Sequence, residues 1–144
     1  MASPDSRPIS RSTCPIANAL DLLGDRWTLL VIRDLLFVGK RRFGEILGSP
    51  EGIPTNILSD RLRRLEESGV VEKVPYQSRP TRYEYQLTAK GRDLFPVLRA
   101  LIDWAARHLP DVASSPPPGV LERYEESLRK LSAMPADPEE PHAE

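Results

Sequence analysis

One stretch, residues 53–87, constrains the fold of this 144-residue chain more than any other. Its first part, residues 54–68, has leucines three and four residues apart, which is the spacing of a helix that buries one face. These leucines are Leu58, Leu62 and Leu65. The opposite face carries short polar and basic side chains, and Gly69 ends the helix. We therefore predict a helix that is anchored on one side and presents a polar surface on the other.

The second part of the stretch predicts a β-hairpin. Residues 70–74 and 83–87 are β-branched or aromatic with partial alternation, which is typical of antiparallel strands. The connection, residues 75–82, is too long for a two-residue turn and contains a proline, so we expect its tip to project. Arg79 and Arg82 place positive charge on this tip.

Three earlier segments have the pattern of helices that support this stretch. The first begins at Pro15 and ends at Gly24. Its apolar face consists of Ile16, Leu20 and Leu23. The second covers residues 26–38, is capped by Asp25 and is apolar nearly all round, so it should be central and buried. The third covers residues 41–47, and a turn leads from it into the helix at residues 54–68.

A long helix is predicted after the hairpin, from Ala89 to His108, with Thr88 as its cap and a kink at Pro96. Its apolar residues are Leu94, Phe95, Val97, Leu98, Leu101, Ile102, Trp104, Ala105 and Leu109. They cover about half of the circumference, more than one internal contact needs. Either the helix touches two helices of its own domain, or part of this surface meets a second subunit. We favour the second explanation because a small domain rarely exposes so wide an apolar strip.

These patterns predict a mainly α fold with a small β-hairpin, and a chain divided into five segments. The segments are a flexible N-terminal arm (residues 1–13), one folded domain (residues 14–109), a Pro-rich linker (residues 110–119), an amphipathic helix (residues 120–132) and a disordered acidic tail (residues 133–144). The formal net charge of −1 is unevenly spread, since residues 1–110 carry +4 and residues 111–144 carry −5. The clustered Lys and Arg side chains all fall between positions 40 and 82. A basic surface confined to one region is typical of a nucleic-acid-binding protein.

The sequence lacks the residue patterns of an enzyme or a metal protein. Two separated histidines and the single Cys14 supply no paired zinc ligands, and no glycine-rich phosphate loop or nucleophile elbow occurs. No apolar run approaches the roughly 18 residues that span a membrane. We therefore expect no catalysis, no cofactor and no membrane partner. The polar N-terminus and the lone cysteine predict a cytoplasmic protein.

The helix at residues 54–68 and the hairpin tip present side chains suited to double-stranded DNA. Such a helix is roughly 22 Å long, and only its first turns need to enter a major groove. There an Asn can bond adenine with two hydrogen bonds, and an Arg can reach guanine or a phosphate. Arginines on the hairpin can contact phosphates or the minor groove. The predicted DNA-binding residues are Arg41, Arg42, Thr55, Asn56, Ser59, Arg63, Arg79 and Arg82.

Two alternatives remain open for this surface. Arg61 and Arg64 flank the leucine stripe, and they either contact DNA or pair with acidic side chains of the same helix. The whole surface could instead serve a protein-interaction module, although the outward face of the helix lacks an apolar hot-spot residue.

Five motifs together resemble the HxlR-type winged helix-turn-helix transcriptional regulators. They are Cys14-Pro15, LLGDRWTLL at residues 22–30, RFGEI at 42–46, GIPTNILSDRL at 52–62 and YEYQLTAKG at 83–91. The match covers residues 14–109 and implies a bacterial homodimer on a two-fold-related, palindromic operator. It also implies that the N-terminal and long C-terminal helices make the dimer. Pro54 departs from the family pattern, in which a serine often caps the recognition helix.

Cys14 has two interpretations. It directly precedes a predicted helix, whose positive dipole end favours a thiolate. Some members of the HxlR-type family use a cysteine at this position to sense oxidants or electrophiles. With one cysteine per chain, sensing would require an adduct or an intersubunit disulfide. Alternatively, Cys14 is a small buried apolar side chain at the dimer seam. A small-molecule effector is also compatible with the sequence.

Overall fold

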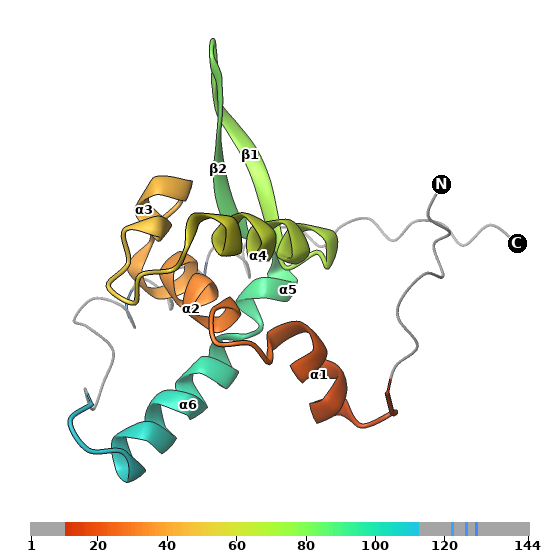
Figure 1. The fold of residues 1–144 in the computed structure, drawn as a ribbon, viewed down its shortest axis with the longest axis vertical. Coiled ribbons are helices and arrows are strands. Elements are labelled where there is room, and N and C mark those ends of the chain that lie inside the picture. The colour runs from red at the N-terminus through yellow and green to blue at the C-terminus, as the bar shows by residue number, and fades with distance from the viewer. Residues whose placement is uncertain (1–10, 113–121, 123–125, 127–128, 130–144) are drawn as a thin grey trace, which may run out of the picture. The chain divides into compact units, whose positions relative to one another are not determined.

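The computed structural model describes residues 11–112 together with residues 122, 126 and 129 (Figure 1). Its elements are α1 (Pro15–Leu23), α2 (Thr28–Arg33), η1 (Asp34–Val38), α3 (Phe43–Leu47), α4 (Thr55–Glu67), β1 (Val71–Ser78), β2 (Thr81–Leu87), α5 (Ala89–Arg92) and α6 (Phe95–His108). The described residues are mainly helical and include one two-stranded antiparallel sheet, which confirms the predicted fold class. The chain divides into two compact units, with the boundary after residue 99. The predictions for residues 1–10 and for most of residues 113–144 lie outside the described residues.

The leucine stripe predicted from the sequence anchors α4. Leu58, Leu62 and Leu65 are each at most 1% exposed, and burial of such a side chain stabilises the fold by about 2 kcal/mol. The helix begins one residue later than predicted, because Pro54 holds the capping position with an extended backbone. Gly69 follows the helix with a φ of 77°, a left-handed conformation that favours glycine. The buried stripe therefore fixes which side of α4 faces outward.

The predicted second helix is confirmed in its burial but wrong in its start and its continuity. It begins at Thr28, two residues later than predicted, and Trp27 holds the capping position without a side-chain cap. The Asp25 carboxylate accepts hydrogen bonds from the backbone N–H groups of Trp27 and Thr28 at 2.8 and 3.0 Å, and so closes the turn that leads into the helix. The last five residues form the π-helical turn η1 in place of regular α-helix. This wider turn begins at Asp34, a carboxylate that is only 2% exposed and bonds to side chains outside the helix.

The third helix begins at Phe43, two residues later than predicted. Arg41 lies outside it because its carbonyl accepts a hydrogen bond from the Tyr85 N–H group of β2 at 2.7 Å. At the capping position, the Arg42 N–H group donates to Glu45 Oε1 at 3.1 Å. The segment before α3 is therefore tied to the hairpin.

The hairpin of β1 and β2, here called the wing, is longer and more regular than the sequence predicted. Strand pairing continues to Ser78 opposite Thr81, so the connection has two residues and the predicted eight-residue tip is wrong. Pro75 is tolerated because each strand of a two-stranded sheet has an open edge. A bulge between Pro75 and Gln77 interrupts the register at Tyr76. Figure 1 shows the wing extending beyond α3 and α4, with α4 beside its base, as expected for a projecting tip.

The long helix predicted after the wing is broken into two helices. The Thr88 cap is confirmed, since its hydroxyl oxygen accepts a hydrogen bond from the Gly91 N–H group at 3.3 Å. The chain then leaves the helix at residues 93–94, and Pro96 falls in the first turn of α6, where its missing N–H group costs nothing. The helix is therefore interrupted just before Pro96, and the predicted kink within one continuous helix is wrong. Neither helix, nor any other in the described part of the chain, is long and apolar enough to cross a membrane.

Candidate nucleic-acid interface

The outward face of α4 carries the polar side chains that the sequence singled out. Thr55, Asn56, Ser59 and Arg63 are all exposed, and the first three lie within the first two turns of the helix. The four other predicted contacts are exposed as well, namely Arg41, Arg42, Arg79 and Arg82. The structure therefore leaves every predicted DNA-binding side chain accessible, and their contact with DNA stays a prediction.

Arg63 is held by carboxylates of its own helix. Its guanidinium lies 2.7 Å from Asp60 Oδ1 and 3.0 Å from Glu67 Oε1, one turn away in each direction. The hydrogen bond from Arg63 lowers the pKa of the Asp60 carboxyl below its usual value. Arg63 is thus oriented along the surface of α4, and the two carboxylates compete with a base or a phosphate for its N–H groups.

The sequence predicted only one of the two ion pairs that Arg61 makes. Arg61 pairs with Asp60, as one alternative predicted, and it also donates to Asp25 Oδ1 at 3.1 Å, which joins α4 to the start of α2. Burial alone would raise the pKa of Asp25, but hydrogen bonds from Thr28, Trp27 and Arg61 outweigh it and lower this pKa to about 2. No local sequence pattern indicates this contact, because it spans 36 residues.

A buried polar network supports the turn between α3 and α4. The Ser49 hydroxyl donates to Asp34, the Lys40 ammonium donates to the Ser49 oxygen at 2.6 Å, and Arg33 bridges Asp34 and Glu51. Sequence reasoning missed this network, although an acidic residue within a mostly apolar segment was an available signal. The network fixes the chain that leads into α4.

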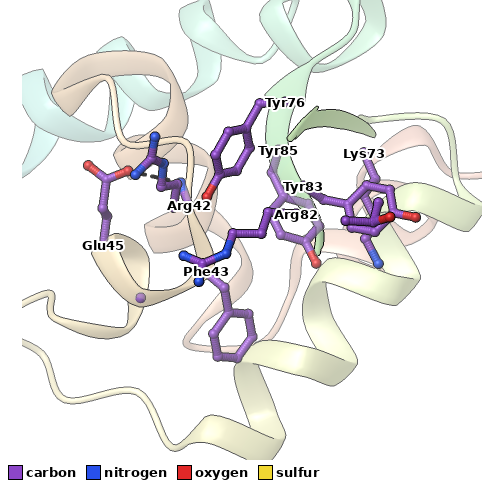
Figure 2. A pocket seen from close by; sticks show the side chains of 10 residues that line it. Arg42, Phe43, Glu45, Lys73, Tyr76, Arg82, Tyr83 and Tyr85 are labelled. Atoms are coloured by element: carbon purple, nitrogen blue, oxygen red, sulfur yellow. Dashed lines mark hydrogen bonds between the residues drawn. The ribbon is translucent and has the colours of Figure 1, made fainter. Parts of the chain in front are cut away.

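A groove of about 620 Å³ lies between the start of α3 and the wing (Figure 2). The Arg42 guanidinium stacks on the Tyr76 ring with its carbon 4.4 Å from the ring centroid, and it lies 3.7 Å from Glu84 Oε1. Lys73 and Arg82 line the groove from the wing strands. Arg42 and Arg82, which are far apart in the sequence, thus border the same groove.

Cys14 is an exposed free thiol at the capping position of α1. The α1 helix that follows has no buried residue, and its apolar side chains Ile16 and Leu20 are 70% and 53% exposed. The predicted apolar face therefore exists but is not covered within the described chain. No group of three His, Cys, Asp or Glu side chains in the described residues could hold a metal ion.

A helix, a turn and a second helix with an outward polar face, followed by a projecting two-stranded wing, define the winged helix-turn-helix class. The family model for the HxlR-like helix-turn-helix matches residues 22–113. The chain belongs to this family.

Relatives and solved structures agree with this assignment. An uncharacterized HTH-type transcriptional regulator of Mycobacterium bovis is 50% identical over 95 residues, which cover 66% of this chain and 59% of that protein. The candidate transcription factor PA1607 has a solved structure with 44% identity and a TM-score of 0.64, covering 72% of each chain. The reduced transcriptional regulator YodB of Bacillus subtilis has 32% identity and a TM-score of 0.57, covering 71% of this chain and all of YodB. The same regulator has also been solved in a quinone-bound form.

Proposed function

We propose that this chain is a DNA-binding transcriptional regulator without catalytic activity that recognises a specific sequence. The observation that carries the proposal is the exposed row of Thr55, Asn56 and Ser59 on the first turns of α4. The buried leucine stripe turns this row outward, and exposed arginines stand before α3 and on the wing. In this role α4 reads base edges in the major groove, and the flanking arginines contact the backbone.

The proposed regulator acts as a homodimer on a palindromic operator. Support comes from two uncovered apolar faces. On α1 these are Ile16 and Leu20, and on α6 they are Val97, Leu101 and Trp104, which are 43%, 48% and 53% exposed at helical spacing. Apolar strips of this width usually meet a partner. In a two-fold dimer the two α4 helices enter successive major grooves about 34 Å apart.

The test is selection of bound genomic fragments, followed by gel shifts on the recovered sequence and on a scrambled duplex of the same length. We expect the parent to prefer the recovered sequence by at least ~1,000-fold. Asn56→Ala should reduce this preference, because it removes a base contact while leaving the phosphate contacts in place. Equal affinity for both duplexes at every salt concentration would contradict a sequence-specific regulator, and no DNA binding at all would favour a protein-interaction module.

A second candidate function is redox or electrophile gating through Cys14. The favouring observation is an exposed thiol at the start of a helix whose apolar face is uncovered, together with the quinone-bound structure of a relative. A bulky group on this thiol would disturb a dimer seam built on α1. The test is alkylation with iodoacetamide, which should change operator affinity in the parent and leave Cys14→Ser unaffected. Unchanged affinity of the alkylated parent would exclude gating at this residue.

A further inference from the structure

A series of ion pairs, here called the ion-pair path, connects the entry of α2 with the outward face of α4. Arg61 lies at its centre, with Nε 3.1 Å from Asp25 Oδ1 and Nη1 2.5 Å from Asp60 Oδ2. The other oxygen of Asp60 lies 2.7 Å from Arg63 Nη2, and Arg63 Nη1 lies 3.0 Å from Glu67 Oε1. Five charged side chains of alternating sign are therefore linked without a gap.

The side chains become more exposed along the ion-pair path. Arg61 is 17% exposed, Asp60 is 38% exposed and Arg63 is 58% exposed. An isolated ion pair in water holds its side chains weakly, because the solvent screens the charges and fixing long side chains costs entropy. The pairs at the inner end are screened less, so the orientation of the outer side chains depends on the inner ones.

The inner end of the path is fixed by the backbone. Asp25 Oδ1 accepts hydrogen bonds from the Trp27 and Thr28 N–H groups at 2.8 and 3.0 Å, and Oδ2 accepts one from the Thr28 hydroxyl. Thr28 is itself only 2% exposed. The Asp25 carboxylate is therefore held in one orientation and presents Oδ1 to Arg61 at a defined place.

The outer end of the path leaves donors for a ligand. A guanidinium has five N–H groups, and the hydrogen bonds from Arg63 to Asp60 and Glu67 each use one. Arg63 can therefore keep its bond to Asp60 while it donates to a base. An arginine whose planar fork is already oriented loses less conformational freedom when it bonds two acceptors of a guanine.

We propose that Arg61 is a positioning residue for base recognition and acts without contacting DNA. It holds Asp60 against Asp25, and Asp60 in turn directs the guanidinium of Arg63. The turn before α2 thereby influences which base α4 selects. This inference rests on the proposed function, in which the outward face of α4 reads bases.

The test compares affinity for the sequence recovered from the genomic selection with affinity for the scrambled duplex of the same length, by fluorescence anisotropy at about 150 mM NaCl. Lost charge and a smaller folded fraction affect both duplexes alike, so the ratio of the two affinities reports base recognition alone. We expect Arg61→Gln and Asp25→Asn each to lower this ratio roughly fivefold. Arg61→Lys should lower it as well, since an ammonium has no planar fork to bridge Asp25 and Asp60.

The matched control is Arg26→Gln, which removes the cation next to Asp25 in the sequence. Arg26 is exposed and lies over the Trp27 ring, outside the ion-pair path. The ratio of affinities for this variant should equal that of the parent. Parent-like ratios for both Arg61→Gln and Asp25→Asn would overturn the proposal, and so would an equal reduction by the control.

A positioning role also requires that the effect of Arg61 passes through Arg63. In the Arg63→Gln background, Arg61→Gln should cause no further loss of sequence preference. An equal loss in both backgrounds would show that Arg61 acts by another route, such as a displacement of the whole helix, and would overturn the proposal. A parent-like ratio for Arg63→Gln alone would overturn it too.

Failure of the positioning role is distinguishable from failure of the proposed function. If the parent prefers the recovered sequence and the variants of Arg61 and Asp25 keep this preference, the positioning role falls and sequence-specific binding stands. If the parent binds both duplexes equally, the proposed function fails and the positioning role fails with it.

Discussion

Helix α4 and the groove between α3 and the wing both carry basic side chains, but their charges are arranged differently. On α4, Arg61 and Arg63 each pair with two carboxylates at 2.5 to 3.1 Å. In the groove, Lys73 and Arg82 have no such partner among the described residues. The helix therefore holds its side chains in defined orientations, which suits the reading of bases, while the groove keeps its charge available for phosphates.

The two regions are also anchored differently, and the largest effect is expected where α4 is anchored. Asp34→Ala removes the carboxylate that Ser49, Arg33 and Lys40 share in a nearly dry site. Loss of one partner from a buried charge network leaves the others uncompensated, so we expect a loss of about 3 kcal/mol in the free energy of unfolding. Urea denaturation followed by circular dichroism measures it.

The matched control is Asp93→Ala, which removes an exposed carboxylate that has no ion pair among the described residues. Its effect should stay within about 0.5 kcal/mol. A similar loss for both variants would contradict a specific role for the Asp34 network.

At the base of the wing, Gly91→Ala should destabilise the fold by about 2 kcal/mol. A Cβ atom at this position would lie 2.3 Å from the Val70 carbonyl oxygen and 2.9 Å from Leu87 Cδ2, so α5 would have to move away from the wing. Gly44→Ala is the control in α3, where an added Cβ meets nothing within 4 Å. The control should be neutral or slightly stabilising, and thermal melts that rank the two variants in the opposite order would contradict the close packing.

The Asp25–Arg61 contact predicts a pH dependence of stability. The pKa of Asp25 is about 2 in the folded chain against 3.8 in the unfolded chain. A lowered pKa contributes stability that is fully present above the unfolded value and is lost as the pH falls from about 4 through 2. We expect a contribution of about 1–2 kcal/mol, since the carboxylate is partly exposed.

The measurement is denaturation of the parent and of Asp25→Asn between pH 2 and pH 7. The variant should be less stable at neutral pH, and the difference should shrink toward pH 2. A difference that is constant over this range would show that the charge of Asp25 contributes nothing.

The sequence predicted those parts of both regions that depend on local spacing. The leucine stripe of α4 and the cap at Thr88 follow from residues within one or two turns, and the structure confirms both. Asp25 bonds to the backbone at the entry to α2, although this helix begins two residues later than predicted. The apolar face of α1 also follows from spacing, whereas its exposure is visible only in the structure.

Features that depend on distant contacts were wrong or missed. The start of α3 lies later than predicted because the Arg41 carbonyl accepts a hydrogen bond from the Tyr85 N–H group, 44 residues away in the sequence. The π-helical turn forms where the Asp34 carboxylate accepts a hydrogen bond from the Ser49 hydroxyl. The wing was predicted too short because strand pairing tolerates Pro75 at an open edge. The groove was missed because a bulge, which no local pattern encodes, brings Tyr76 and Arg42 together.

The smallest expected effect is the most direct test of the contrast between the two regions. Asp60→Asn removes a carboxylate from both Arg61 and Arg63 and leaves Arg63 with Glu67 alone. If pairing on α4 withholds charge from DNA, affinity for an arbitrary duplex should rise roughly two- to threefold, with a slope against salt that steepens by less than 1. Sequence preference should fall, because a freed Arg63 is less well oriented.

Glu72→Gln is the control, since it removes one exposed negative charge from the wing without releasing an arginine. At 150 mM salt, exposed charges more than ~8 Å apart are largely screened, so a change of net charge alone should have a smaller effect. Equal gains for the two variants would mean that net charge explains the affinity. The arginines of α4 would then be as available to DNA phosphates as the cations of the groove. The pairing with carboxylates on α4 would not separate a region that orients its side chains from a region that supplies charge.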